Sequence, residues 1–135
     1  MSLVTPQSIA TVLGLQRLPQ TFAELDEIVG KGLPKESIRA SIDQVCLNPE
    51  DRKRLLHRII PEATFKRRKD CLSSEESQRA ERLARVYAAA LFVWDSSEEA
   101  RAFLNTPHAM LSEKTPLEVS LTEIGARRVE ELLWR

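Results

Sequence analysis

Apolar residues recur at helical spacing along the chain, in short segments separated by prolines, glycines and capping residues. In the first half, each segment opens on a capping residue or a proline. The predicted helices run from Pro6 toward Leu13, from Phe22 to Val29, from Pro34 through Val45, from Pro49 to the residue before Pro61, and from Pro61 to about Lys69. Pro61 cannot continue the hydrogen bonds of the preceding helix, so we expect Ile60 to be extended.

The second half of the chain begins with the longest predicted helix, which also has a broad apolar face. Ser73 with Glu76 forms a capping box, which predicts a helix from there to about Trp94. This face is rich in alanine, and small side chains let other helices approach closely, so we expect the helix to be central. Asp95-Ser96-Ser97-Glu98-Glu99 is another cap, before a helix predicted to reach Leu104. Further helices are predicted for one turn after Thr115-Pro116 and from Thr122 to the end. No segment alternates β-branched residues at a period of two, so the prediction is an all-α fold of seven to eight short helices.

The composition is that of a folded domain, and the charge is unevenly placed. The 135 residues are 42% hydrophobic and 30% charged with zero net charge, which excludes wholesale disorder and leaves room for one compact domain or two very small ones. Between positions 52 and 69, however, a single acid, Glu62, accompanies eight of the 20 basic residues: Arg52, Lys53, Arg54, Arg58, Lys66, Arg67, Arg68 and Lys69. Such a block is typical of a surface that meets phosphates.

Two short helices joined by a tight turn at about 47–70 fit a helix-turn-helix, whose second helix enters the DNA major groove. Phe65 is expected to anchor that helix against Leu55 and Leu56. Thr64 and Arg68, four residues apart, are expected to share a face and reach base edges. The remaining candidates are expected to contact the DNA backbone: Lys66, Arg67 and Lys69 from the second helix, and Arg52, Lys53 and Arg58 from the first.

Two observations argue for alternatives to this interpretation. A basic run is often only a solvated face, although here it coincides with a proline-started helix and a basic helix before it. The turn of a helix-turn-helix usually contains a glycine with positive φ, whereas this one holds Arg58, Ile59 and Ile60. Either the turn is reshaped or DNA binding is weak.

Signals for catalysis, metals and membranes are absent from the sequence. Cys46 and Cys71 show no CxxC spacing, and His57 and His108 stand in no ligand pattern, so we expect free thiols in a reducing cytosol and no metal. No glycine-rich phosphate loop or nucleophile–base spacing occurs, and the paired glutamates at helix starts are explained by capping. No apolar run approaches the ~18 residues of a membrane span. We therefore expect a cytoplasmic binding protein with no cofactor, rather than an enzyme.

Specific motifs carry a family resemblance over about residues 20–135. From Leu72 onward the chain reads LSSEESQRAERLARVYAAALFVW, AxxFLNTPH, TPLE and TEIGARRVEELL. This series resembles the Xre/MbcA/ParS-like toxin-binding antitoxins, and most of all the Xre antitoxins paired with RES-domain toxins. In the first half, GLPKES and IIPEATFKRRK resemble the degenerate Xre helix-turn-helix of that family.

The resemblance implies function by binding. Such an antitoxin of a type II toxin–antitoxin system neutralises its RES-domain toxin, an enzyme that consumes NAD⁺, and represses its own operon on operator DNA. A homodimer and a higher hetero-oligomer with the toxin are expected. The division would fall between an N-terminal region, 1–70, and a C-terminal toxin-binding domain, 71–135. The toxin-binding candidates are Pro107, His108, Leu111, Pro116, Arg127, Arg128, Trp134 and Arg135.

Several positions in this second half have a local physical role. Pro107 and Pro116 are expected to fix turns, and Gly125 to permit close packing of the last helix. Apolar positions there could form either core or a partner-facing patch: Leu111, Leu117, Val129, Leu132 and Leu133. The family's C-terminal segment is thought to lie against the toxin's active site. Relatives continue with a tail resembling I-E-H-G after the position of Arg135, so either a tail is missing here or the plugging role is lost.

A second function stays open at this point. The chain could be a freestanding helix-turn-helix transcription regulator whose C-terminal half only dimerises. A toxin gene abutting this one would favour the antitoxin.

Overall fold

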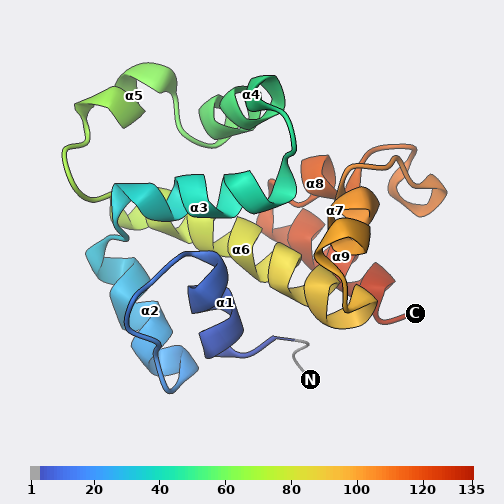
Figure 1. Ribbon diagram of the computed structural model, residues 1–135, viewed down its shortest axis with the longest axis horizontal. Coiled ribbons are helices and arrows are strands. Elements are labelled where there is room, and N and C mark those ends of the chain that lie inside the picture. Colours follow the sequence, from blue (N-terminus) through green and yellow to red (C-terminus); the bar gives the residue numbers. More distant parts are fainter. Residues whose placement is uncertain (1–3) are drawn as a thin grey trace.

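The computed structural model describes residues 4–135, and within that range every regular element is a helix (Figure 1). This range contains nine α-helices, seven of them with seven or more residues, and one 3₁₀ turn, η1, between α7 and α8. Their bounds are α1 Pro6–Val12, α2 Phe22–Lys31, α3 Lys35–Val45, α4 Pro49–Ile59, α5 Glu62–Arg67, α6 Ser74–Trp94, α7 Ser97–Leu104, η1 Ala109–Leu111, α8 Pro116–Val119 and α9 Glu123–Leu133. The predicted all-α fold is confirmed.

The caps predicted from sequence form as expected. Thr5, Thr21, Asn48, Ser73, Thr115 and Thr122 each accept a hydrogen bond from a backbone N–H in the first turn of the helix that follows. Ser73 and Glu76 complete the capping box at the start of α6. These bonds satisfy amide groups that a helix start otherwise leaves without partners, which is why the helix starts could be located from sequence.

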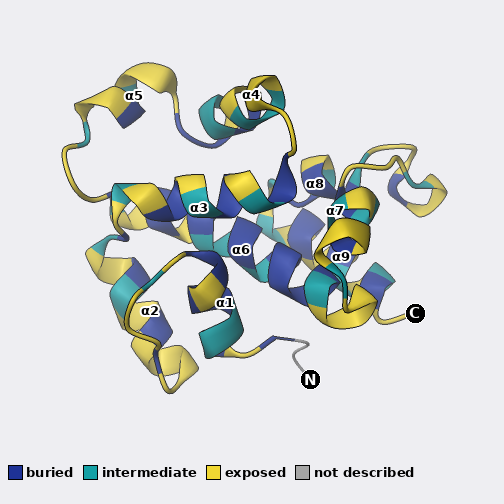
Figure 2. Cartoon of the chain, viewed as in Figure 1, coloured by how far each residue is buried: buried dark blue, intermediate teal, exposed yellow. Residues whose placement is uncertain are grey.

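Helix α6 is the central element, as its alanine-rich face predicted. It runs through the middle of the fold and contacts α1, α2, α3 and α4 as well as α7 and α9 (Figure 1). Ala80, Ala84 and Ala88–Ala90 are buried along it, and Figure 2 shows its buried positions running along the helix. Because both halves of the chain pack on this helix, they share one core; the division at residues 70/71 stays a prediction.

Two glycines allow close backbone approaches. Gly32 ends α2 with φ of +109°, and a Cβ there would lie 2.5 Å from the carbonyl oxygen of Leu72. A Cβ on Gly125 would lie within bond-like distance of the carbonyl oxygen of Val119, so the expected close packing of α9 is confirmed.

The segment after α5 is fixed to the turn between α2 and α3. The Leu72 N–H donates to Leu33 O at 2.8 Å, and the Lys35 N–H donates to Asp70 O at 2.8 Å. The buried Ser77 hydroxyl accepts from the Leu33 N–H at 2.7 Å. These bonds join the segment 70–72 to the start of α3 and thereby hold α5 above that helix (Figure 1). Within residues 4–135, no helix has the length and hydrophobicity required to cross a membrane.

Candidate functional site

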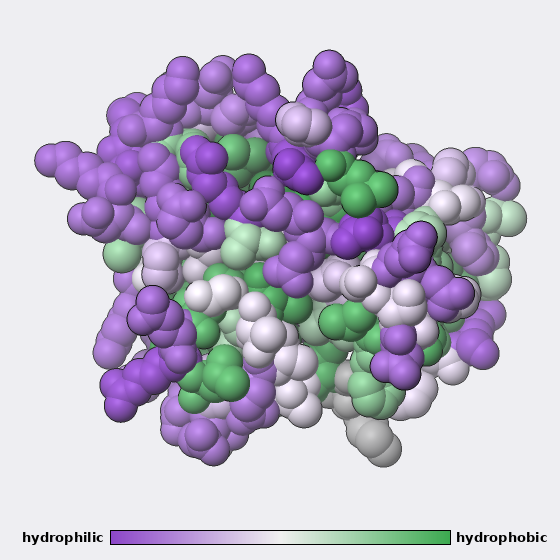
Figure 3. Space-filling model, in the orientation of Figure 1, coloured by the Kyte–Doolittle hydropathy of each residue, from purple (hydrophilic) through white to green (hydrophobic). Residues whose placement is uncertain are grey.

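Helices α4 and α5 lie together on one side of the molecule, above α3 and α6 (Figure 1). In Figure 3 this side is covered mostly by hydrophilic side chains. Lys53, Arg58, Lys66, Arg67 and Lys69 are exposed there. These five residues of the basic block are thus exposed on α4, on α5 and just after α5, and they are together called the basic surface below.

The turn between α4 and α5 contains no glycine because it needs no positive φ. Ile60 is extended, with φ of −134° and ψ of 123°, and Pro61 follows with φ of −53° and ψ of 143°. Both conformations suit the residues present, and Ile60 is fully buried. Arg79 of α6 donates to Ile59 O at 3.1 Å and so fixes the end of α4. The turn is reshaped, which is one of the two alternatives that the sequence left open.

Helix α5 is shorter than predicted, and this changes the role of Arg68. The helix ends at Arg67, and Arg68 follows in extended conformation, so Thr64 and Arg68 do not share a helix face. The Arg68 guanidinium instead donates two hydrogen bonds of 2.9 Å to the Glu76 carboxylate. Mainly because of these hydrogen bonds from Arg68, the pKa of the Glu76 carboxyl group lies below its ordinary value. The prediction that Arg68 reaches a base edge from the helix was wrong in its geometry.

Arg52 is also engaged within the chain. Its guanidinium donates to Cys46 O at 3.2 Å and to Leu47 O at 2.8 Å, and lies 3.7 Å from Asp43. It closes the junction of α3 and α4, and its contact with a DNA backbone stays a prediction. Thr64 and Arg67 interact weakly, the Arg67 guanidinium lying 3.4 Å from the Thr64 hydroxyl. Lys66 lies 3.5 Å from Glu62 in an exposed pair.

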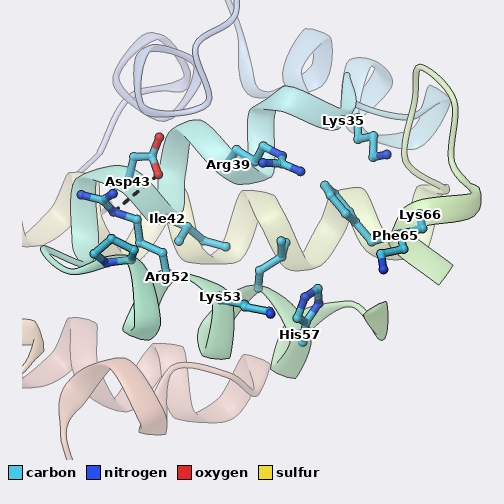
Figure 4. Close-up of a pocket in the computed structure, with 11 residues that line it drawn as sticks. Lys35, Arg39, Ile42, Asp43, Arg52, Lys53, His57, Phe65 and Lys66 are labelled. Carbon is cyan, nitrogen blue, oxygen red and sulfur yellow. Dashed lines mark ion pairs between the residues drawn. The ribbon is translucent and has the colours of Figure 1, made fainter. Parts of the chain in front are cut away.

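An open cleft of about 420 Å³ lies between α3, α4 and α5 (Figure 4). Phe65 is buried at its inner side, where Leu56 also lines the cleft, in accord with the expected anchoring role. The Phe65 ring lies under two cations of α3: Lys35 Nζ at 4.4 Å and the Arg39 guanidinium at 5.0 Å from the ring centroid. Lys35 and Arg39 were missed by sequence reasoning, although their spacing of four residues places them on one helix face.

The C-terminal candidates divide into buried and exposed residues. Leu111 and Pro116 are buried, so they hold the loop between α7 and α8 in place and are corrected from contact residues to core residues. His108 caps η1, its Nδ1 accepting from the Met110 N–H at 3.1 Å. Pro107 is exposed at the start of this loop.

The exposed candidates lie at the end of α9 and beside the loop. The exposed candidates are Arg127, Arg128, Trp134 and Arg135, and 54% of the Trp134 surface is exposed to solvent. Sequence reasoning missed Ile124, which is 75% exposed, and Met110, which is 55% exposed. A shallow pocket joins the loop to α9 and is lined by Met110, Leu111, Arg128, Glu131, Leu132 and Arg135. These exposed residues of η1 and α9 are called the C-terminal surface below.

Each of the two surfaces lies in a region of the chain that matches a known family. Residues 24–85, which include α4 and α5, match the antitoxin Xre-like helix-turn-helix domain. Residues 88–135, which include the C-terminal surface, match the antitoxin Xre/MbcA/ParS C-terminal toxin-binding domain. The chain belongs to the Xre family of antitoxins. A comparison of this antitoxin with curated proteins gave no match.

The two matched regions of the antitoxin meet within α6, and a partly buried ionic network joins α6 to α9. Arg85 contacts Glu81 at 3.1 Å, Glu123 at 2.9 Å and Glu130 at 3.7 Å. Arg82 adds hydrogen bonds to Glu123 at 3.2 Å and to Leu121 O at 2.9 Å. Burial raises the pKa values of the Glu81 and Glu130 carboxyl groups. The network thus holds the toxin-binding domain on the helix that also supports the helix-turn-helix.

The described residues offer no arrangement for a metal: residues 4–135 contain no cluster of three His, Cys, Asp or Glu side chains placed to hold one. Cys46 is buried and Cys71 is exposed, and both are free thiols.

Proposed function

We propose that this antitoxin binds and neutralises a RES-domain toxin that consumes NAD⁺, and that it represses its own operon by binding operator DNA. The observation that carries the proposal is the pairing on one chain of an Xre-like helix-turn-helix with a toxin-binding domain of the Xre/MbcA/ParS type. The protein acts by binding in the cytoplasm, without a cofactor or a reaction of its own.

The DNA-binding part of the proposal rests on the basic surface. Lys66 and Arg67 project from α5, Lys53 and Arg58 from α4, and Lys69 follows α5. Flexible lysines and exposed arginines of this kind contact phosphates and position the helix, while Thr64 is the α5 side chain that remains for a base edge. Arg68 and Arg52 contribute by holding α5 and α4 in place.

Operator binding tests this part. The double variant Lys66→Ala/Arg67→Ala should bind operator DNA more weakly and with a flatter salt dependence, by roughly 0.9 log units per log unit of salt for each phosphate that the protein no longer neutralises. Arg17→Ala removes an exposed cation outside the basic surface and should bind as the unchanged protein does. Unchanged affinity and slope in the double variant would place the DNA contact elsewhere.

The toxin-binding part rests on the C-terminal surface. Met110 lines a shallow pocket together with Arg128 and Arg135. Ile124 at the start of α9 and Trp134 just after its end are exposed apolar side chains, and Arg127 is an exposed cation of α9. Aromatic residues, methionine and arginine are the types enriched at protein interfaces. We expect this surface to contact the toxin, with Pro107 and His108 shaping the loop that presents Met110.

Growth of cells that express the toxin tests the toxin claim. A RES-domain protein encoded beside the antitoxin gene should arrest growth alone, and co-expression of the antitoxin should restore it. Trp134→Ser/Arg128→Glu should lose rescue, whereas Lys66→Ala/Arg67→Ala should keep it. An antitoxin that binds its operator but never rescues growth would instead be a freestanding transcription regulator.

We further propose that the antitoxin is a homodimer that assembles with the toxin into a larger complex. Support comes from exposed apolar residues at the end of α6: Phe92 is 68% exposed, and Val93 and Trp94 follow it. Trp94 packs against Phe103 of α7 with ring centroids 6.2 Å apart, which stiffens this patch. Sedimentation should give a dimer for the unchanged protein and a monomer for Phe92→Ser, with Phe22→Ser as the matched exposed control. A monomer for the unchanged protein would refute the dimer.

A further inference from the structure

The cleft between α3, α4 and α5 has an apolar inner side and a cationic rim (Figure 4). Ile42, Leu56 and Phe65 form the inner side. Its rim carries five cations, Lys35, Arg39, Arg52, Lys53 and Lys66, and one acid, Asp43. Asp43 is paired with Arg52 at 3.7 Å, so the charge that remains at the rim is positive.

In the part of the chain that the structure describes, two of the five rim cations are paired with a carboxylate, Arg52 with Asp43 and Lys66 with Glu62 at 3.5 Å, and the other three are not. Within residues 4–135, Lys35, Arg39 and Lys53 form no ion pair with a carboxylate. Lys35 and Arg39 are held instead by the Phe65 ring, and Lys35 also donates to Arg68 O at 3.0 Å. An aromatic ring orients a cation while leaving its charge available to an anion.

We propose that this cleft binds a phosphate ester, with Arg39 and Lys53 holding the anion and the apolar inner side taking the attached organic group. An arginine with lysines beside it is the usual protein chemistry for phosphate. The volume of about 420 Å³ lies in the range of roughly 300–1,000 Å³ that small-molecule sites occupy. A bare phosphate would leave the apolar inner side unused, which favours an ester with an organic group. Because the cleft lies between the helices of the helix-turn-helix match, the ester that we propose is a nucleotide, either in DNA or free.

If the nucleotide belongs to DNA, this proposal rests on the proposed DNA-binding function. If the nucleotide is free, the proposal does not depend on that function. Calorimetric titration with adenosine diphosphate and with inorganic pyrophosphate tests the shared chemistry directly. Both should bind, the diphosphate ester more tightly because its organic group covers the inner side. Arg39→Gln and Lys53→Gln should each weaken binding about tenfold or more, since each removes a charge-assisted hydrogen bond. Arg17→Gln should leave binding unchanged, and circular dichroism should show that all three variants fold.

Operator titrations of the same variants distinguish the two sources. Weaker operator binding by Arg39→Gln, with competition by adenosine diphosphate, would assign the cleft to a nucleotide of DNA. Diphosphate binding with unchanged operator affinity would assign it to a free nucleotide. If neither probe binds, or if Arg39→Gln binds both probes and operator as the unchanged protein does, the proposal is wrong. Failure of the unchanged protein to bind operator would refute the DNA-binding function and leave the nucleotide test standing.

Discussion

At Gly32 both the backbone conformation and a close backbone neighbour oppose a side chain. Its φ is +109°, and a Cβ would meet the Leu72 carbonyl oxygen at 2.5 Å. We predict that Gly32→Ala lowers the free energy of unfolding by about 1–3 kcal/mol, because it combines backbone strain with this clash. Urea unfolding followed by circular dichroism measures the change.

Gly30 supplies the matched control two residues earlier. It lies inside α2, and a Cβ there would meet no atom within 4 Å. Gly30→Ala should therefore raise stability by about 0.5–1 kcal/mol. Equal stability of the two variants would contradict the packing described for Gly32.

The Arg68–Glu76 pair makes a prediction about pH. Arg68 lowers the pKa of Glu76 below the ordinary value of 4.5, so the folded protein binds this proton less readily than the unfolded chain does. The stabilising contribution is present above that ordinary value and is lost as the pH falls through the lower folded-state pKa. Glu76→Gln should thus destabilise the protein at neutral pH, and the difference should shrink in acid. A difference that grows on acidification would refute the pairing.

Single residues differed in how far sequence could reveal their roles. Ser73, Glu76 and Gly125 were predictable because capping and close helix packing depend on neighbours along the chain. Arg68 was not, since its partner lies across a loop and its own backbone leaves the helix one residue earlier. Lys35 and Arg39 join the basic cleft only through the position of Phe65, which is a tertiary contact.

At the scale of helices, the joint between α6 and α9 depends on Arg85. Its side chain is 19% exposed and contacts three carboxylates. We predict that Arg85→Ala lowers the free energy of unfolding by about 3–5 kcal/mol, because it leaves the partly buried carboxylates of Glu81 and Glu130 without the cation with which they pair. Arg128→Ala, on the outer face of α9, should change stability by less than about 0.5 kcal/mol.

Acid should partly restore the Arg85→Ala variant. Burial already raises the pKa values of Glu81 and Glu130, so the folded state takes up these protons more readily than the unfolded chain does. The protonated carboxyl groups therefore stabilise the folded state at low pH. This stabilisation is lost as the pH rises through the folded-state pKa and the buried groups become charged. Thermal unfolding at neutral and mildly acidic pH measures this recovery, and a deficit that widens in acid would argue against the network.

Helix positions were predictable from sequence, while the end of α5 and its turn were not. Caps and apolar spacing located the starts, and Pro61 correctly indicated extended geometry at Ile60. The expectation of a glycine came from the usual motif, whereas the observed turn is made of extended Ile60 and Pro61. Helix α5 stops at Arg67 because the following residues bond to the start of α3 and to Glu76.

For the whole molecule, sequence periodicity predicted the all-α class and the central place of α6, because both follow from local patterns. Sequence periodicity did not predict which charged and apolar residues would be exposed on the folded surface. Leu111 and Pro116 became core, while Ile124 and Met110 became surface. The outcome is one core with a basic surface supported by α4 and α5 and a C-terminal surface supported by α9.

The measurement that tests this account most directly is retention of the toxin by immobilised antitoxin. A RES-domain protein encoded beside the antitoxin gene should be retained by the unchanged protein and by Lys66→Ala/Arg67→Ala, which alters only the basic surface. Trp134→Ser/Arg128→Glu should retain it at least tenfold less well, a decrease of about 1.4 kcal/mol in binding free energy. Absence of retention by the unchanged protein, or loss of retention in the basic-surface variant alone, would contradict the account.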